Sequence, residues 1–130
     1  MKFDPKMLRL YAVTDRAWVG RQSLLEQIED ALRGGVTLVQ LREKALSKEE
    51  FVEEAKAVLA LCRRCGVPLI INDRLDVALE SGADGVHVGI EDAPVAEIRA
   101  QAGPDFIIGA TAKTVAQAQA AQAAGADYLG

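Results

Sequence analysis

The chain has 130 residues, of which 15 are Lys or Arg and 19 are Asp or Glu, giving a formal net charge of −4. Half of the residues are hydrophobic and 26% are charged, which is typical of one globular domain, here residues 1–130. No apolar stretch approaches the ~18 residues of a membrane span, and an acidic chain lacks the clustered cations that nucleic-acid phosphates require. The N-terminus has no apolar signal-peptide core. We therefore expect a cytoplasmic protein with neither a membrane nor a nucleic-acid partner.

A recurrent pattern marks the predicted strands. Five times a glycine closes one segment and a short apolar run follows. Glycine suits helix C-termini because a left-handed backbone penalises a Cβ atom, and nearly continuous apolar runs are typical of strands buried on both faces. An initial strand is expected at Leu8–Val13, and the five runs are residues 35–41, 66–72, 82–88, 103–109 and 125–130.

Helical segments separate these runs. An apolar stripe at helical spacing, capping residues or a first-turn proline mark most of them. The expected helices are Ser23–Arg33, a helix opened by the capping box Ser47 and Glu50 that ends near Cys65, Leu75–Glu80, a helix from Pro94 to about Ala102, and Val115–Ala124 capped by Thr114. Alternation of this kind predicts a parallel sheet in an α/β fold.

Two parallel architectures compete, an open doubly wound sheet and a (β/α)₈ barrel of the TIM type. No G-x-G-x-x-G follows the first strand, so the barrel is favoured over a dinucleotide-binding sheet. A complete barrel needs eight units and ~200 or more residues. We count about five βα units plus the start of a sixth strand at residues 127–130, so we expect the N-terminal part of a TIM barrel.

Two cysteines form a C-x-x-C motif, Cys62 and Cys65. A redox pair of the thioredoxin type places its first cysteine at a helix N-terminus, where the pKa falls. Here both lie at the end of a predicted helix. Zinc takes about four ligands, and the chain has one histidine. A structural role is therefore predicted for both cysteines.

Polar residues gather where the predicted strands end, which is where parallel βα folds carry function. Strand alternation places Gln40, Arg42 and Lys44 on one side and Leu41 on the other. Two cations and an amide suit an anionic ligand such as a phosphate ester. The alternative is a loop whose charges face water.

Two carboxylates, Asp73 and Asp92, end successive predicted strands. Neighbouring strands are ~5 Å apart, so both could bind one ion, and few oxygen ligands near phosphate describe a Mg²⁺ site. Helix-start roles are the alternative for each. The single histidine, His87, lies among apolar residues, and we expect it to be a packed or hydrogen-bonded residue rather than a catalyst.

The motifs resemble the thiamine-phosphate synthase family in order and spacing over essentially the whole chain. They are Leu10–Arg16, Gly35–Lys44, Pro68–Arg74, Asp84–Gly89 and Gly125–Gly130. The resemblance implies a (β/α)₈ barrel and a transferase that joins hydroxymethylpyrimidine diphosphate to hydroxyethylthiazole phosphate and releases diphosphate. It implies that the segment Gln40, Leu41, Arg42, Glu43 and Lys44 binds the pyrimidine diphosphate, with Arg42 and Lys44 catalytic. It further implies that Asn72 and Thr111 contact substrate, Thr111 standing where many members have Ser, and that Asp73 and Asp92 bind Mg²⁺.

Two departures from the family follow from the same comparison. Ile90 replaces the usual Gln, and the family continues beyond Gly130 with phosphate-binding loops. We therefore expect the 130-residue chain alone to be inactive, to expose two edge strands, and either to form homo-oligomers or to fold loosely, with core positions such as Val39 and Ile70 partly covered.

Two alternative functions stay open. One is a thiazole tautomerase-like barrel, which shares Asn72 to Arg74 without needing both carboxylates, and the other is a non-catalytic half-barrel that only binds or assembles.

Overall fold

The computed structural model describes residues 1–130 apart from the side chain of Trp18, a residue to which the sequence assigns no chemistry and whose side chain lies outside the described part. Six strands form one parallel sheet in sequential order. They are β1 (Tyr11–Val13), β2 (Leu38–Leu41), β3 (Leu69–Asn72), β4 (Gly85–Val88), β5 (Ile107–Ala110) and β6 (Tyr128–Leu129). All five glycine-led apolar runs therefore contain strands, as predicted.

Five α-helices lie between the strands: α1 (Leu24–Arg33), α2 (Lys48–Cys65), α3 (Leu75–Ser81), α4 (Val95–Ala102) and α5 (Val115–Ala124). The predicted capping box of Ser47 and Glu50 is present, and Thr114 caps α5 through the Gln117 N–H. The five predicted punctuating glycines all have positive φ. No described helix is long and apolar enough to cross a membrane.

The first strand begins later than predicted. Residues Pro5–Arg9 form a 3₁₀ helix, η1, whose N-terminus is capped by the Asp4 side chain, and only Tyr11–Val13 pair with β2. A second 3₁₀ turn, η2 (Arg16–Trp18), follows β1. The Thr37 hydroxyl accepts from Leu10 N–H at 2.9 Å and donates to the Met7 carbonyl at 2.7 Å. These contacts fold the apolar residues around Leu8 into a turn, so hydrophobicity alone misplaced the strand start.

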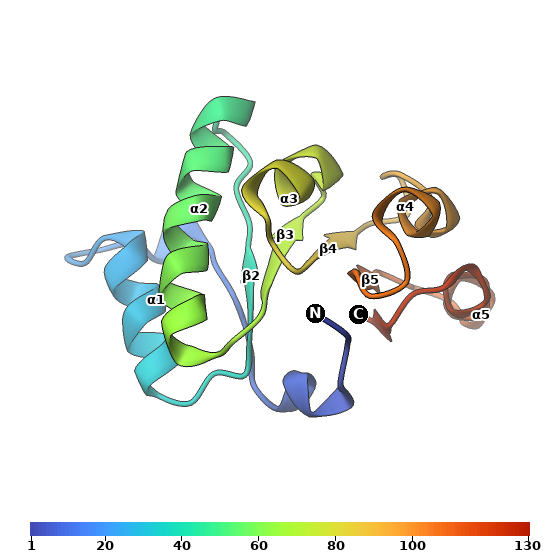
Figure 1. The fold of residues 1–130 in the computed structure, drawn as a ribbon, viewed down its shortest axis with the longest axis horizontal. Helices are drawn as coiled ribbons and strands as arrows, with labels where there is room; N and C mark the ends of the chain where they lie inside the picture. The colour runs from blue at the N-terminus through green and yellow to red at the C-terminus, as the bar shows by residue number, and fades with distance from the viewer.

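The sheet is strongly curved, and its helices surround the outer face in an arc (Figure 1). Six strands ~4.8 Å apart would place β1 and β6 roughly 24 Å apart in a flat sheet. Instead the hydroxyls of Tyr11 and Tyr128 meet at 2.5 Å. Strand order without a reversal excludes the doubly wound alternative. The fold is a half-barrel of six parallel strands.

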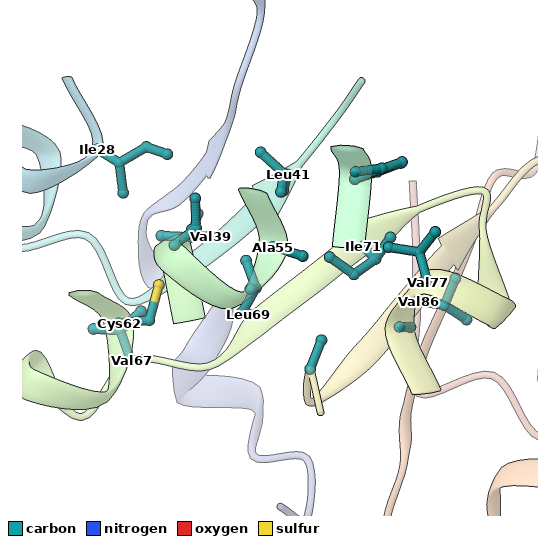
Figure 2. Close-up of a cluster of buried hydrophobic side chains, with 14 of the residues drawn as sticks. Ile28, Val39, Leu41, Ala55, Cys62, Val67, Leu69, Ile71, Val77 and Val86 are labelled. Carbon is teal, nitrogen blue, oxygen red and sulfur yellow. The ribbon is translucent and has the colours of Figure 1, made fainter. Parts of the chain in front are cut away.

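The larger core lies between the outer face of the sheet and the helices (Figure 2). Alternate strand residues such as Val39, Leu41 and Ile71 pack against helix residues such as Ile28 and Ala55 there. All three strand residues have no exposed surface. Burial of apolar surface of this kind is the main stabilising contribution to the fold.

A smaller core lies on the concave face, formed by Leu38, Ile70, Ile107 and Tyr128. The N-terminal segment covers it, with the Phe3 ring stacked on Tyr128 at 6.0 Å between centroids. Ile70 therefore has 0% exposure, and so has Val39 beneath the helices. The expectation that these two positions are only partly covered was wrong, because the helices cover Val39 on the outer face and the N-terminal turn covers Ile70 on the inner face.

Two buried or half-buried aspartates tie helices to the amino ends of strands. The Asp84 carboxylate accepts hydrogen bonds from Nη1 and Nη2 of Arg63, at 2.8 and 2.7 Å, and from the Leu69 N–H at 2.8 Å. Asp127 repeats the arrangement with the Arg99 guanidinium and the Ile108 N–H, both at 2.9 Å. Each carboxylate thus joins a helix, the start of one strand and the residue preceding the next. We call these two contacts the arginine–aspartate latches.

Candidate active site at the carboxyl ends of the strands

A cleft of about 520 Å³ opens where β3, β4 and β5 end. Its polar lining comes from Asp73, Glu91, Asp92, Thr111 and Lys113. These residues belong to loops that follow three neighbouring strands. The topology therefore brings Asp73, Asp92 and Thr111 together, as the sequence predicts, and adds the side chains of Glu91 and Lys113.

Asp73 is held by its backbone and by Lys44. Its φ is +64°, the only positive value of a non-glycine residue in the described backbone, a region that Asp tolerates better than most residues. The Asp73 N–H donates to the His87 carbonyl at 2.8 Å, and the Lys44 ammonium donates to its carboxylate. The N-cap of α3 is Arg74, which makes no side-chain capping bond. The helix-start role considered for Asp73 is therefore not what the structure shows.

The carboxyl group of Asp92 faces the carboxylate of Asp73. Its Oδ2 accepts the Gly89 N–H at 2.7 Å, while α4 has Pro94 as its N-cap with no side-chain capping bond. Burial raises the Asp92 pKa, and the neighbouring Asp73 carboxyl raises it further. Two carboxyl groups thus share the positive charge of Lys44.

Asp73 and Asp92 supply fewer protein ligands than a metal centre enclosed entirely by protein side chains has. No group of three or more His, Cys, Asp or Glu that could hold a metal ion occurs among the described residues. Mg²⁺ commonly takes one or two carboxylates and completes its octahedron with water and substrate phosphates. Asp73 and Asp92 fit that donor set, because their carboxyl groups face each other and a cation between them would offset their mutual repulsion.

A hydrogen-bonded set of side chains connects Lys44 to the interior of the half-barrel. Lys44 Nζ donates to Asn72 Oδ1 at 2.9 Å, and Asn72 Nδ2 donates to Gln40 Oε1 at 2.7 Å. Gln40 is buried, and its Nε2 donates to the Tyr11 hydroxyl at 2.9 Å. Gln40, Asn72 and Lys44 therefore lie on the concave side, in agreement with the predicted alternation of β2.

The remaining residues of the predicted binding segment lie elsewhere. Leu41 is fully buried in the outer core, and the Glu43 carboxylate points toward α2. Any substrate contact of these two residues must therefore come from their backbone. Arg42 is exposed at the end of β2, its N–H donating to the Thr14 hydroxyl at 3.0 Å. No ion pair of its guanidinium occurs among the described residues.

A carboxylate pair between the end of β2 and α2 escaped sequence analysis. Arg16 Nη2 contacts both Glu43 and Glu54 at 2.7 Å, and the Glu43 side chain is only 3% exposed. Burial and the adjacent Glu43 carboxyl raise the pKa of Glu54 to about 7, against the lowering effect of Arg16. Glu54 lies on a helix among several exposed glutamates, so nothing in the local pattern distinguished it.

His87 is a hydrogen-bonded interior residue, as predicted. Its Nδ1 lies 3.1 Å from the Tyr128 hydroxyl and its Nε2 lies 3.0 Å from the Thr111 hydroxyl. Burial lowers the pKa of His87, although Asp73 and Asp92 oppose this. Sequence analysis missed the two tyrosines that hydrogen-bond to Gln40 and His87, because Tyr11 and Tyr128 are separated by 117 positions.

The two cysteines lie far from this chemistry. Both are free thiols, Cys62 buried in the outer core and Cys65 exposed. Burial raises the pKa of Cys62 to about 12, which opposes the thiolate that redox exchange requires. The structural role predicted for Cys62 is consistent with this environment.

The fold and the cleft together define a parallel βα-repeat protein whose charged chemistry lies at the carboxyl ends of its strands. The model of one family, described as thiamine monophosphate synthase, matches residues 10–130. The chain belongs to the thiamine monophosphate synthase family.

Individual relatives agree with this assignment. The thiamine-phosphate synthase of Caldanaerobacter subterraneus is 50% identical over 121 residues, covering 93% of this chain and 56% of its own length. A chloroplastic thiamine biosynthetic bifunctional enzyme of Arabidopsis thaliana is 50% identical over 132 residues, covering 98% of this chain and 25% of its own length. The solved structure of thiamine phosphate pyrophosphorylase from Pyrococcus furiosus superposes with a TM-score of 0.87 at 38% identity, over 95% of this chain and 59% of that one. The chain thus spans little more than half the length of these single-function relatives.

Proposed function

We propose that this chain carries the pyrimidine-diphosphate and Mg²⁺ site of a thiamine-phosphate synthase with a (β/α)₈ barrel. The reaction joins hydroxymethylpyrimidine diphosphate to hydroxyethylthiazole phosphate and releases diphosphate. The observation that carries the proposal is the facing pair Asp73 and Asp92 beside Lys44, in a cleft that Thr111 also lines. A pair of carboxyl groups that shares a single lysine suits a ligand that brings both a cation and phosphate oxygens.

The proposed chemistry needs no enzyme nucleophile. The C–O bond between the pyrimidine methylene and the diphosphate breaks, and the diphosphate leaves with the electron pair. The thiazole nitrogen then donates its lone pair to the methylene carbon and forms the new C–N bond. An electron-rich pyrimidine stabilises cationic character at that carbon, so the barrier depends mainly on stabilising the leaving group.

The residues of the cleft have separate roles in this proposal. Asp73 and Asp92 would hold Mg²⁺, which supplies charge neutralisation to the leaving diphosphate oxygens. Lys44, anchored by Asn72 and Asp73, places an ammonium beside the same oxygens. Arg42, whose guanidinium has no ion pair among the described residues, supplies a second cation.

Gln40 and Asn72 would orient the pyrimidine. Their amides are already hydrogen-bonded to each other at 2.7 Å, so their orientations are set before ligand arrives. The presence of both carboxylates favours this function over the tautomerase-like alternative, which does not need the pair.

The test is Mg²⁺-dependent binding of hydroxymethylpyrimidine diphosphate to residues 1–130, measured by isothermal titration calorimetry. A hydrogen-bonded contact to a charged group is worth about 1.5–3 kcal/mol, or roughly 10- to 150-fold in Kd, so we expect Lys44→Ala and Asp73→Asn each to weaken binding on that scale. Cys65→Ser, an exposed thiol remote from the cleft, is the matched control and should bind like the parent chain. Binding that is unaffected by Mg²⁺, or by both cleft substitutions, would refute the proposal.

A further inference from the structure

Hydrogen bonds connect side chains from every strand or strand end of the half-barrel into one continuous series. The series starts at Lys44 and ends at Thr111. The order is Lys44, Asn72, Gln40, Tyr11, Tyr128, His87 and Thr111, with separations of 2.9, 2.7, 2.9, 2.5, 3.1 and 3.0 Å. Lys44 contacts Asp73 and Thr111 lines the cleft, so both ends of the series reach the candidate active site.

The Lys44 end fixes the direction of the first three bonds. An ammonium group can only donate, so the Asn72 atom that faces it must be the carbonyl oxygen. The Asn72 amide nitrogen consequently faces Gln40 and donates to its oxygen. The Gln40 amide nitrogen then faces Tyr11 and donates to the Tyr11 hydroxyl oxygen.

The tyrosine pair transmits this direction. Only one proton can lie between the two hydroxyl oxygens at 2.5 Å. If Tyr11 donates it, Tyr128 keeps its own proton for His87 Nδ1, and every donor has an acceptor. If Tyr128 donates it instead, the Tyr11 proton has no acceptor among the described residues. Tyr11 is half-buried, and hydroxyls away from water rarely leave a proton unpaired, so the arrangement that pairs both tyrosine protons is favoured.

The histidine state follows from this count. With Nδ1 accepting from Tyr128, the ring is neutral and carries its proton on Nε2, which donates to the Thr111 oxygen. An imidazolium or an Nδ1–H ring would need Tyr128 as an acceptor, and would leave the proton of either Tyr11 or Tyr128 unpaired.

We propose that Tyr128 and His87 are positioning residues that hold the Thr111 hydroxyl as a hydrogen-bond donor into the cleft. Because Thr111 accepts from His87, its own proton cannot point back to the ring. A ligand that takes the free proton of this hydroxyl must offer a hydrogen-bond acceptor, as phosphate or diphosphate oxygens do. The identity of that ligand rests on the proposed function, whereas the proton placement rests only on the hydrogen bonds.

The decisive measurement is the tautomer of the single histidine. The chain has one histidine, so a long-range ¹H–¹⁵N correlation spectrum of uniformly labelled protein at one fixed pH gives one unambiguous ring pattern. We expect an unprotonated Nδ1 and a protonated Nε2. An Nδ1–H or doubly protonated ring in the parent chain would overturn the inference without any variant being needed.

Two tyrosine variants test the direction of the series. Tyr128→Phe removes the donor to Nδ1 and should shift the ring toward the Nδ1–H form. Tyr11→Phe removes a hydroxyl from the same cluster but leaves Tyr128 free to donate, so the Nε2–H pattern should persist. Equal responses of the ring to both variants would contradict the inference, because a general packing defect would affect both alike.

Inorganic diphosphate with Mg²⁺ is the ligand probe. Reorienting one neutral donor should weaken its binding to Tyr128→Phe about tenfold, the loss expected for one hydrogen bond. Unchanged diphosphate binding in a variant whose tautomer has changed would refute the role of Thr111. Failure of pyrimidine-diphosphate binding with an intact Nε2–H ring would instead refute the proposed function alone.

Discussion

Removing one arginine–aspartate latch should destabilise the fold by an amount that its contacts determine. Asp84 is 6% exposed and accepts three hydrogen bonds, two from Arg63 and one from the Leu69 N–H. In Asp84→Ala the buried Leu69 N–H loses its acceptor, which costs about 1–3 kcal/mol. The Arg63 side chain is 44% exposed and can turn to water, so losing its ion pair adds only about 0–1 kcal/mol. The total is about 1–4 kcal/mol.

Asp84→Asn separates the two contributions. The amide oxygen of asparagine can still accept the Leu69 N–H, so the losses are the charge interaction with Arg63 and the hydrogen bond from its Nη2, which can turn to water. We expect this variant to cost about 1 kcal/mol or less. The alanine variant should therefore be clearly less stable than the asparagine variant, and this difference measures the buried backbone bond.

Urea unfolding followed by far-UV circular dichroism measures both variants, with m-values compared to confirm a common denatured state. Glu29→Gln is the control, because its pair with Arg33 is largely exposed and should be worth less than about 0.5 kcal/mol. The reasoning fails if Asp84→Asn is as destabilising as Asp84→Ala, since the loss would then come from the charge rather than from the Leu69 N–H.

Two further predictions concern stability. The pKa of Glu54 is raised to about 7 from 4.5 by burial and by Glu43, so the folded state holds this proton more tightly than the unfolded chain does. The free energy of unfolding should therefore fall by about 1–3 kcal/mol as pH rises from about 5 to 8. In urea unfolding, Glu54→Gln should make this fall smaller. An unchanged pH dependence in that variant would exclude Glu54 as its source. A Cβ at Gly109 would lie 2.1 Å from Tyr128 Cζ, so Gly109→Ala should cost about 1–3 kcal/mol in the same assay. Gly20→Ala, which meets no atom within 4 Å, should cost much less, and equal losses would show that the ring does not limit position 109.

Sequence analysis predicted the parts of the fold that local chemistry determines. Punctuating glycines and apolar runs located the strands, and the Ser47 capping box located the start of α2. The meeting of Asp73 and Asp92 was also predictable, because the ends of consecutive parallel strands are neighbours in space. These inferences required only the period of a strand and the topology of a βα repeat.

Contacts between distant segments could not be predicted in this way. The Tyr11–Tyr128 hydrogen bond depends on the curvature of the whole sheet. The burial of Ile70 depends on the 3₁₀ turn near the N-terminus, part of which the apolar residues alone predict as a strand. The outward direction of Glu43 follows from the alternation of β2, but its partner Glu54 becomes known only when α2 is docked. Whether Arg42 and Mg²⁺ act as proposed stays a prediction.

The chain uses aspartate in opposite ways at the two ends of its sheet. At the amino ends, Asp84 and Asp127 each have an arginine and a backbone N–H of their own, so their charges are balanced within the protein. At the carboxyl ends, Asp73 and Asp92 share one lysine, and a surplus negative charge remains. Electrostatic frustration is thus confined to one rim of the half-barrel. The loops at that rim can change in sequence, and the cleft with them, while the opposite end continues to hold the strands in register.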